Sequence, residues 1–193
     1  MQTKETIETI SSNHSLSVKT ITYIGLMTAI LCILGPMSIP IGVIPMSLTN
    51  FAVFFIAVLL GGKMGTISVA VYLLLGAIGL PVFSGFTGGV GKLFGPTGGY
   101  LLAFLLSPMM IALCEQFVKK KVVASIIGMI VASIVIYILG SGWLAVQTGM
   151  TMEAAVATGV IPFLLFDAGK IAAVILLAIP VKKVLVRING EMK

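Results

Sequence analysis

Apolar residues fill six long runs of the chain, and short segments rich in glycine, proline or lysine separate these runs. The runs cover residues 18–34, 46–60, 64–80, 98–118, 122–146 and 160–181. A helix needs about 20 apolar residues to cross the hydrocarbon core of a bilayer. The runs lack the alternation of apolar and polar positions that marks the strands of a membrane barrel. The pattern therefore predicts an all-α integral membrane protein with six transmembrane helices, two of them short.

The composition agrees with a molecular surface that faces lipid. Of the 193 residues, 59% are hydrophobic and only 9% are charged, whereas a soluble domain carries about 25% charged residues. This balance excludes a cytosolic enzyme, a secreted disulfide-rich scaffold and a disordered chain. We expect a multi-pass protein of the cell membrane, with the lipid bilayer as a partner. No nucleic-acid partner is expected, although the formal net charge is +6.

The basic residues are confined to alternate connections between the runs. They precede the first run, follow the second, the fourth and the sixth, and comprise Lys4, Lys19, Lys63, Lys119, Lys120, Lys121, Lys182, Lys183, Arg187 and Lys193. The remaining connections contain only Lys92. Because positive residues mark the cytoplasmic side of a membrane protein, both termini are predicted to be cytoplasmic. This parity is consistent with six spans.

We divide the chain into a polar N-terminal segment over 1–17, one transmembrane domain over 18–186 and a cytoplasmic tail over 187–193. No cleaved signal peptide is expected, because no short apolar core with a small-residue cleavage site follows the first residues. Two cysteines, Cys32 and Cys114, lie apart in apolar runs and are expected to be buried free thiols. With a single histidine, His14, neither a metal site nor a cofactor is expected.

Asp167 and Lys170 are the two charges that lie well inside an apolar run. Each charge at the centre of a bilayer costs about 2.5–3.5 kcal/mol on insertion scales, so apolar residues would insert more easily there. Three positions apart on a helix, the two side chains share a face and can pair. We interpret them as a polar ligand site in which Asp167 accepts from N–H groups and Lys170 donates to a carbonyl or carboxylate. The alternatives are a salt bridge that only fixes helix register and a proton relay.

The connections on the side opposite the lysines are long, which favours a face that binds or gates a ligand. They cover 35–45, 81–97 and 147–159. Long loops can also merely join distant helix ends. The glycine-rich stretch 85–92 resembles a phosphate-binding loop only superficially, because Phe86 stands at a required glycine and Leu93 at the required Ser or Thr. ATP binding is therefore rejected. Glycines such as Gly89 and Gly98 instead permit close approach of the backbone to a ligand, or they make a flexible connector.

Further candidate ligand contacts lie at the same ends of the runs. They are Thr49, Asn50, Phe86, Tyr100, Trp143 and Gln147. Tyrosine and tryptophan at this depth are often only interfacial anchors, whereas a buried asparagine amide needs hydrogen-bond partners. In the first run, Gly25 and Ala29 form a small-x-x-x-small pattern that lets another helix approach closely. That helix belongs either to this chain or to another protein.

Several segments together resemble the BioY family, the biotin-specific substrate-binding (S) components of energy-coupling-factor (ECF) transporters. The resemblance covers about 18–186 and is densest over 71–83 and in Gly-Pro-Thr-Gly-Gly-Tyr at 95–100. The family's pattern is also similar to Pro45-Met-Ser-Leu48 and to Asp167-x-x-Lys170. The motif after the glycine-rich loop is the most specific of these signals.

Three positions, at two places in the chain, depart from the family's pattern. The family commonly has Gln where Thr49 stands, and Pro-Gly where Leu165 and Phe166 stand, so a straighter sixth helix is expected here. The resemblance implies the S-component fold, no enzymatic activity, and a high-affinity biotin site near the external face, capped by the first external loop. The ureido ring of biotin has two N–H donors and one carbonyl, which suit Asp167 and Lys170 with Asn50 nearby.

The resemblance also implies partners and walls for the site. Docking onto a membrane coupling subunit and two ATPases is expected, with Gly25 and Ala29 contacting the coupling subunit. The apolar rings of biotin would pack against Phe86, Tyr100 or Trp143. A self-sufficient secondary biotin carrier is the first alternative, although such carriers usually contain two repeated halves. A membrane enzyme that uses the Asp–Lys pair as acid and base is the second, and it would usually need more polar residues around the pair.

Overall fold

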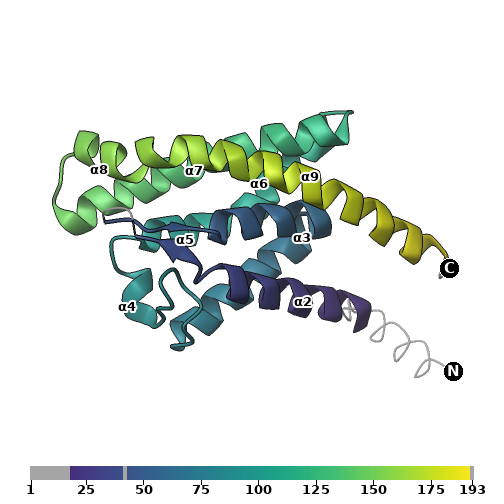
Figure 1. The fold of residues 1–193 in the computed structure, drawn as a ribbon, viewed down its shortest axis with the longest axis horizontal. Helices are drawn as coiled ribbons and strands as arrows, with labels where there is room; N and C mark the ends of the chain where they lie inside the picture. Colours follow the sequence, from purple (N-terminus) through teal and green to yellow (C-terminus); the bar gives the residue numbers. More distant parts are fainter. Residues whose placement is uncertain (1–17, 41–42, 192–193) are drawn as a thin grey trace, which may run out of the picture.

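The computed structural model describes residues 18–40 and 43–191, without the side chains of residues 186 and 188–191. The predicted segment 1–17 with Lys4 and His14, residues 41–42 of the first external loop, and Lys193 lie outside this part. The elements are α2 (Val18–Leu34), β1 (Ser38–Ile39), β2 (Met46–Ser47), α3 (Thr49–Ala77), α4 (Val90–Leu93), α5 (Gly98–Phe104), α6 (Ser107–Phe117), α7 (Lys121–Thr148), α8 (Met152–Gly159) and α9 (Ile161–Glu191). Figure 1 shows the long helices α2, α7 and α9 running along one common axis.

The chain turns back inside α3. Gly61 has φ +76° and ψ −174°, a backbone conformation that essentially only glycine adopts. In a straight helix, Ala57 and Gly65 would lie about 12 Å apart, whereas a Cβ built on Gly65 lies 3.5 Å from the Ala57 Cα. The second and third predicted spans are therefore the two halves of α3, which run in opposite directions in Figure 1.

The fourth predicted span is broken rather than continuous. It consists of α5 and α6, which meet at a bend of 40°. Pro108 stands in the first turn of α6 and has no N–H to donate to the carbonyl of Phe104, which favours a bend at this point. In contrast, α9 passes Leu165 and Phe166 without interruption, as the absence of Pro-Gly there predicts.

By length and composition, three helical stretches of the described chain can cross a membrane, or four if α5 and α6 form one bent span. This number counts both halves of α3 together, and α2 is shorter, with 17 residues. The mostly helical membrane fold is confirmed, whereas the number of six spans stays a prediction. The segment between α2 and α3 also contains a feature that the sequence did not predict, the two-residue strands β1 and β2, which pair antiparallel.

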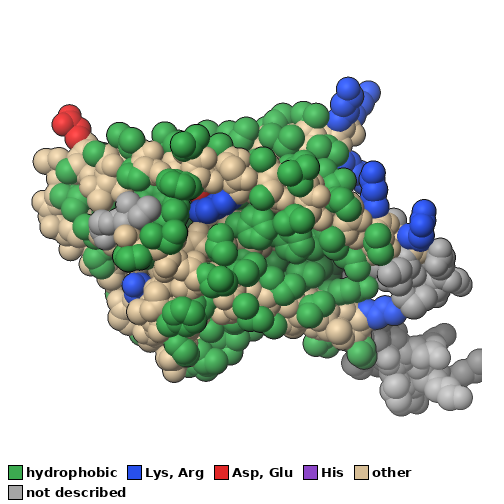
Figure 2. All heavy atoms as spheres, viewed as in Figure 1, with side chains coloured by type: hydrophobic (Ala, Val, Ile, Leu, Met, Phe, Trp, Pro, Cys, Tyr) green, Lys and Arg blue, Asp and Glu red, His purple; other side chains and the backbone are tan. Residues whose placement is uncertain are grey.

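The basic residues gather at one end of the molecule. At this end α2 begins, α3 turns back, α7 begins and α9 finishes, and Figure 2 shows most of the visible lysine and arginine side chains there, beside flanks covered by apolar side chains. The strands and α8 lie at the opposite end. The charge separation agrees with the predicted topology, and the side of the membrane that each end faces stays a prediction.

The core of the molecule is built around α3, which packs against α2, α6 and α9. Near the end opposite the lysines, Tyr72 donates its hydroxyl to the carbonyl oxygen of Val82 at 3.0 Å. Its ring meets Phe83 edge-on, with the ring centroids 5.5 Å apart. The Gly85 N–H donates to the Pro36 carbonyl at 3.0 Å, so the loops 35–45 and 81–97 are tied to each other and to α3.

Candidate ligand-binding site

A pocket of about 580 Å³, including its open mouth, lies among the ends of α3, α5, α7 and α9 that are remote from the lysines. Residues of the three loops that the sequence predicts to be external complete its wall: Ile44 and Pro45 from the first, Ser84 from the second, and Gly159 at the end of α8. These loops belong to the end of the molecule that the sequence predicts to be external.

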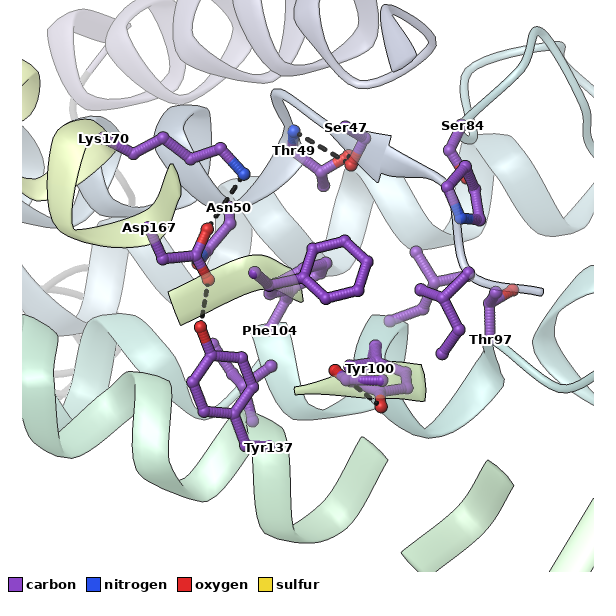
Figure 3. A pocket seen from close by; sticks show the side chains of 16 residues that line it. Ser47, Thr49, Asn50, Ser84, Thr97, Tyr100, Phe104, Tyr137, Asp167 and Lys170 are labelled. Atoms are coloured by element: carbon purple, nitrogen blue, oxygen red, sulfur yellow. Dashed lines mark hydrogen bonds and ion pairs between the residues drawn. The ribbon is translucent and has the colours of Figure 1, made fainter. Parts of the chain in front are cut away.

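One end of the pocket holds the Asp167–Lys170 pair. The Lys170 Nζ lies 2.9 Å from the Asp167 Oδ1, and their side chains are 13% and 8% exposed. The hydroxyl of Tyr137, on α7, donates to the other carboxylate oxygen, Oδ2, at 2.6 Å. Figure 3 shows the carboxylate held between these two donors. Each carboxylate oxygen has two acceptor sites, so Asp167 can still accept hydrogen bonds from a ligand.

Asn50 lies at the same end of the pocket, on the first turn of α3. Its side chain is nearly buried, and its Oδ1 has no hydrogen-bond partner among the described residues. A buried polar atom without a partner is costly, so this oxygen is suited to accept from a ligand. Thr49, which also lines the pocket, already donates its hydroxyl to the Gly35 carbonyl at 3.2 Å.

The middle of the pocket is apolar and aromatic. Tyr100 and Phe104, both on α5, line it together with Ile136 of α7. The Tyr100 hydroxyl donates to the Gly159 carbonyl at 3.2 Å, so this side chain presents its ring rather than a free polar group. At the far end from Asp167 stand Thr97 and Ser84, as Figure 3 shows. The pocket therefore has two polar ends and an apolar middle.

Five predicted contacts lie outside this pocket. Trp143 packs beside Gly98 and donates its ring N–H to the Gly95 carbonyl at 2.9 Å. The Gly89 N–H donates to the Gly76 carbonyl. Gln147 is exposed, and Phe86, which is 70% exposed, lines a different cavity.

This second cavity, of about 1,400 Å³ including its open mouth, is lined mainly by apolar side chains from the segment between α2 and α3, from α3 and from α9. It shares Ser47 and Lys170 with the pocket. The two cavities therefore adjoin at the Asp–Lys end.

Other sequence predictions concern residues away from the pocket. Gly25 and Ala29 are exposed on α2, and a Cβ at Gly25 would meet no atom within 4 Å. The small-residue strip is therefore not covered by another described helix. Cys32 and Cys114 are free, and each is half-buried rather than buried. The described residues contain no group of three His, Cys, Asp or Glu that could hold a metal ion.

The sequence missed Tyr137, Thr97 and Ser84 as members of the site. Tyr137 lies in a long apolar run, where a tyrosine cannot be told from an aromatic core residue. Its contact with Asp167 of another helix follows only from the packing of α7 against α9. A threonine inside a glycine-rich turn looks like a turn residue. The signal available for Thr97 was its place within the motif at 95–100.

Comparison with known proteins places this pocket in a family context. The model of the BioY family matches residues 6–187. The biotin transporter BioY of Thermotoga maritima is 41% identical over 160 residues, which are 82% of this chain and 93% of that protein. The biotin transporter BioY2 of Lactococcus lactis is 38% identical over 147 residues, 76% of this chain and 81% of that protein.

A solved structure is also similar to this fold. It is the crystal structure, at 2.1 Å, of the S-component for biotin from an ECF-type ABC transporter. The two structures superpose with a TM-score of 0.80 and 33% sequence identity, over 86% of this chain and 92% of that one. The similarity therefore extends over nearly the whole of both chains.

Proposed function

The chain belongs to the BioY family, and on this premise we propose that its pocket binds biotin and that the protein is the biotin-binding subunit of an ECF transporter. Binding takes place from the external side, and the protein itself catalyses no reaction. The vitamin is then delivered with a membrane coupling subunit and two ATPases.

The observation that carries the proposal is the match between the polar end of the pocket and the ureido ring of biotin. The ring has two N–H donors and one carbonyl acceptor. Asp167 and the Asn50 Oδ1 supply two acceptors, and the Asn50 oxygen has no other partner in the described chain. Lys170 has three N–H donors, of which one is used by Asp167. It therefore keeps donors for the ureido carbonyl.

The rest of the pocket suits the remainder of the molecule. The fused rings of biotin are largely apolar, and Tyr100 and Phe104 offer them aromatic walls. Removing this apolar surface from water favours binding by about 25 cal/mol per Å². Ile44 and Pro45 of the first external loop line the pocket as well, which supports the role of this loop as its cap.

The proposed docking onto the coupling subunit is supported by the open strip on α2. Gly25 and Ala29 are exposed, and no described residue occupies the space that a Gly25 side chain would take. Small residues let the backbones of two membrane helices approach closely. A strip of this kind that faces outward is suited to a helix of another protein.

Calorimetric titration of the purified protein with biotin tests the proposed function. We expect binding at a ratio of one to one. Asp167→Asn removes the carboxylate charge, and hydrogen bonds to charged groups contribute about 1.5–3 kcal/mol, so the affinity should fall roughly 10- to 100-fold. Glu153→Gln is the matched control, because this acidic residue is exposed on α8, and it should bind biotin like the unmodified protein. Absence of binding by well-folded protein would contradict the proposal.

A further inference from the structure

The pocket contains a second polar side chain that has no partner. Thr97 is 8% exposed and lines the pocket, and its Oγ1 makes no hydrogen bond to any described residue. In Figure 3 it stands at the end of the pocket opposite Asp167, with Phe104 and Tyr100 between them. A hydroxyl buried in this way is costly unless a ligand or water completes its hydrogen bond.

The position of Thr97 is fixed by the turn that carries it. The Gly98 N–H donates to the Gly95 carbonyl at 2.9 Å, which closes the turn. The ring N–H of Trp143 donates to the same carbonyl, also at 2.9 Å, and so ties the turn to α7. A side chain at Gly99 would run into Trp143 and lie 2.9 Å from the Leu139 carbonyl. The glycine therefore allows the turn to approach Trp143 closely.

We propose that Thr97 donates a hydrogen bond to the carboxylate of the ligand, and that Trp143 is the positioning residue for Thr97. This inference rests on the proposed function. The polar groups of biotin lie at its two ends, and the acceptors and donor at the Asp167 end suit the ureido ring. The valerate tail then runs past Phe104 and Tyr100 towards Thr97 and Ser84. Thr97 contributes one O–H donor there.

The role of Thr97 predicts a selective effect on ligands that carry a carboxylate. Thr97→Val keeps the shape of the side chain and removes the hydroxyl, so the affinity for biotin should fall roughly 10- to 100-fold. Thr97→Ser keeps a hydroxyl and should bind biotin within a few-fold of the unmodified protein. For the biotin analogue whose carboxylate is replaced by a methyl group, Thr97→Val and the unmodified protein should have equal affinities. Binding of this analogue also reports that the variant is folded.

Calorimetric titration of these variants separates the failure of this inference from the failure of the proposed function. If Thr97→Val binds biotin with unchanged affinity while Asp167→Asn does not, biotin binding stands and the role of Thr97 is wrong. If Thr97→Val weakens biotin and the methyl analogue equally, Thr97 does not contact the carboxylate. If the unmodified protein does not bind biotin, both proposals are wrong.

The positioning role of Trp143 has its own test in a double-mutant cycle. Trp143→Phe removes the hydrogen bond to Gly95 and keeps an aromatic ring. If Trp143 acts through Thr97, this change weakens biotin binding several-fold in the unmodified background and has no further effect in the Thr97→Val background. Equal losses in both backgrounds would show that Trp143 does not act through Thr97.

Discussion

At the scale of single residues, the site depends on how the carboxylate of Asp167 is oriented. Lys170 reaches it from the same helix at 2.9 Å and Tyr137 from α7 at 2.6 Å. Donors on both oxygens restrict rotation of the carboxylate before a ligand arrives. An acceptor that is already oriented loses less conformational entropy on binding. Lys170 therefore not only balances the charge of Asp167 but, together with Tyr137, also orients its carboxylate for hydrogen bonds to a ligand.

Tyr137→Phe tests this orientation. The change removes the hydroxyl that donates to Asp167 and keeps the ring, so the affinity for biotin should fall roughly 3- to 10-fold in a calorimetric titration. Tyr100→Phe is the matched control, because its hydroxyl donates to the Gly159 backbone rather than to Asp167. Its effect on the affinity should be smaller. Equal affinities of Tyr137→Phe and the unmodified protein would show that the carboxylate needs no second donor.

The sequence could identify Asp167 and Lys170 because a charge inside an apolar run is rare and conspicuous. It could also identify Asn50, since a buried amide requires partners. The structure places Trp143, Gln147 and the predicted glycines outside the pocket, because shared membrane depth does not determine the direction of a side chain. Whether a residue at the end of a helix faces the pocket or a neighbouring helix depends on packing, which a single sequence does not specify.

At the scale of elements, hydropathy placed the start of each helical region within a few residues, but it ended the last run at 181, whereas α9 continues to Glu191. It located the reversal between the second and third regions at the glycine pair and lysine over 61–63, where the backbone indeed turns back. It missed the break between α5 and α6, although Pro108 provides a signal for it. The strands β1 and β2 have only two residues each. Such short strands have no periodicity of their own and arise from contacts between loop ends.

Gly61→Ala tests the reversal in α3. Alanine in this backbone conformation should destabilise the protein by about 1–3 kcal/mol. The cost comes from the backbone alone, because the added Cβ meets no atom within 4 Å. Unfolding in detergent by heat or denaturant measures the change. Gly91→Ala, which also enters open space but at an ordinary φ, should have little effect. If Gly61→Ala instead stabilised the protein, as in a regular helix interior, the reversal would be wrong.

At the scale of the whole molecule, the two ends differ in charge and in the length of their connections. The basic end has short connections and lies away from the pocket, whereas the opposite end contains the loops that line it. The flanks between these ends expose many large apolar side chains, as expected for a surface in lipid. The strip at Gly25 and Ala29 lies on this surface, and its small side chains leave room beside α2. The proposed ligand capture and the proposed docking of a partner therefore use separate surfaces.

Gly25→Leu tests this separation. A leucine should fill the strip and block biotin uptake by cells that also contain the coupling subunit and the ATPases, while the affinity of the purified protein for biotin stays unchanged. Gly142→Leu is the matched control, since it also enters open space but lies on α7. It should support normal uptake. Normal uptake with Gly25→Leu would show that this strip is not the docking surface.

The most direct test of the central claim is an experimental structure of the protein with biotin. We expect the ureido ring within hydrogen-bond distance of Asp167, Asn50 and Lys170. The fused rings should lie against Tyr100 and Phe104, with the carboxylate at the opposite end of the pocket. Biotin bound in the second cavity, or bound elsewhere on the chain with this pocket empty, would contradict the account.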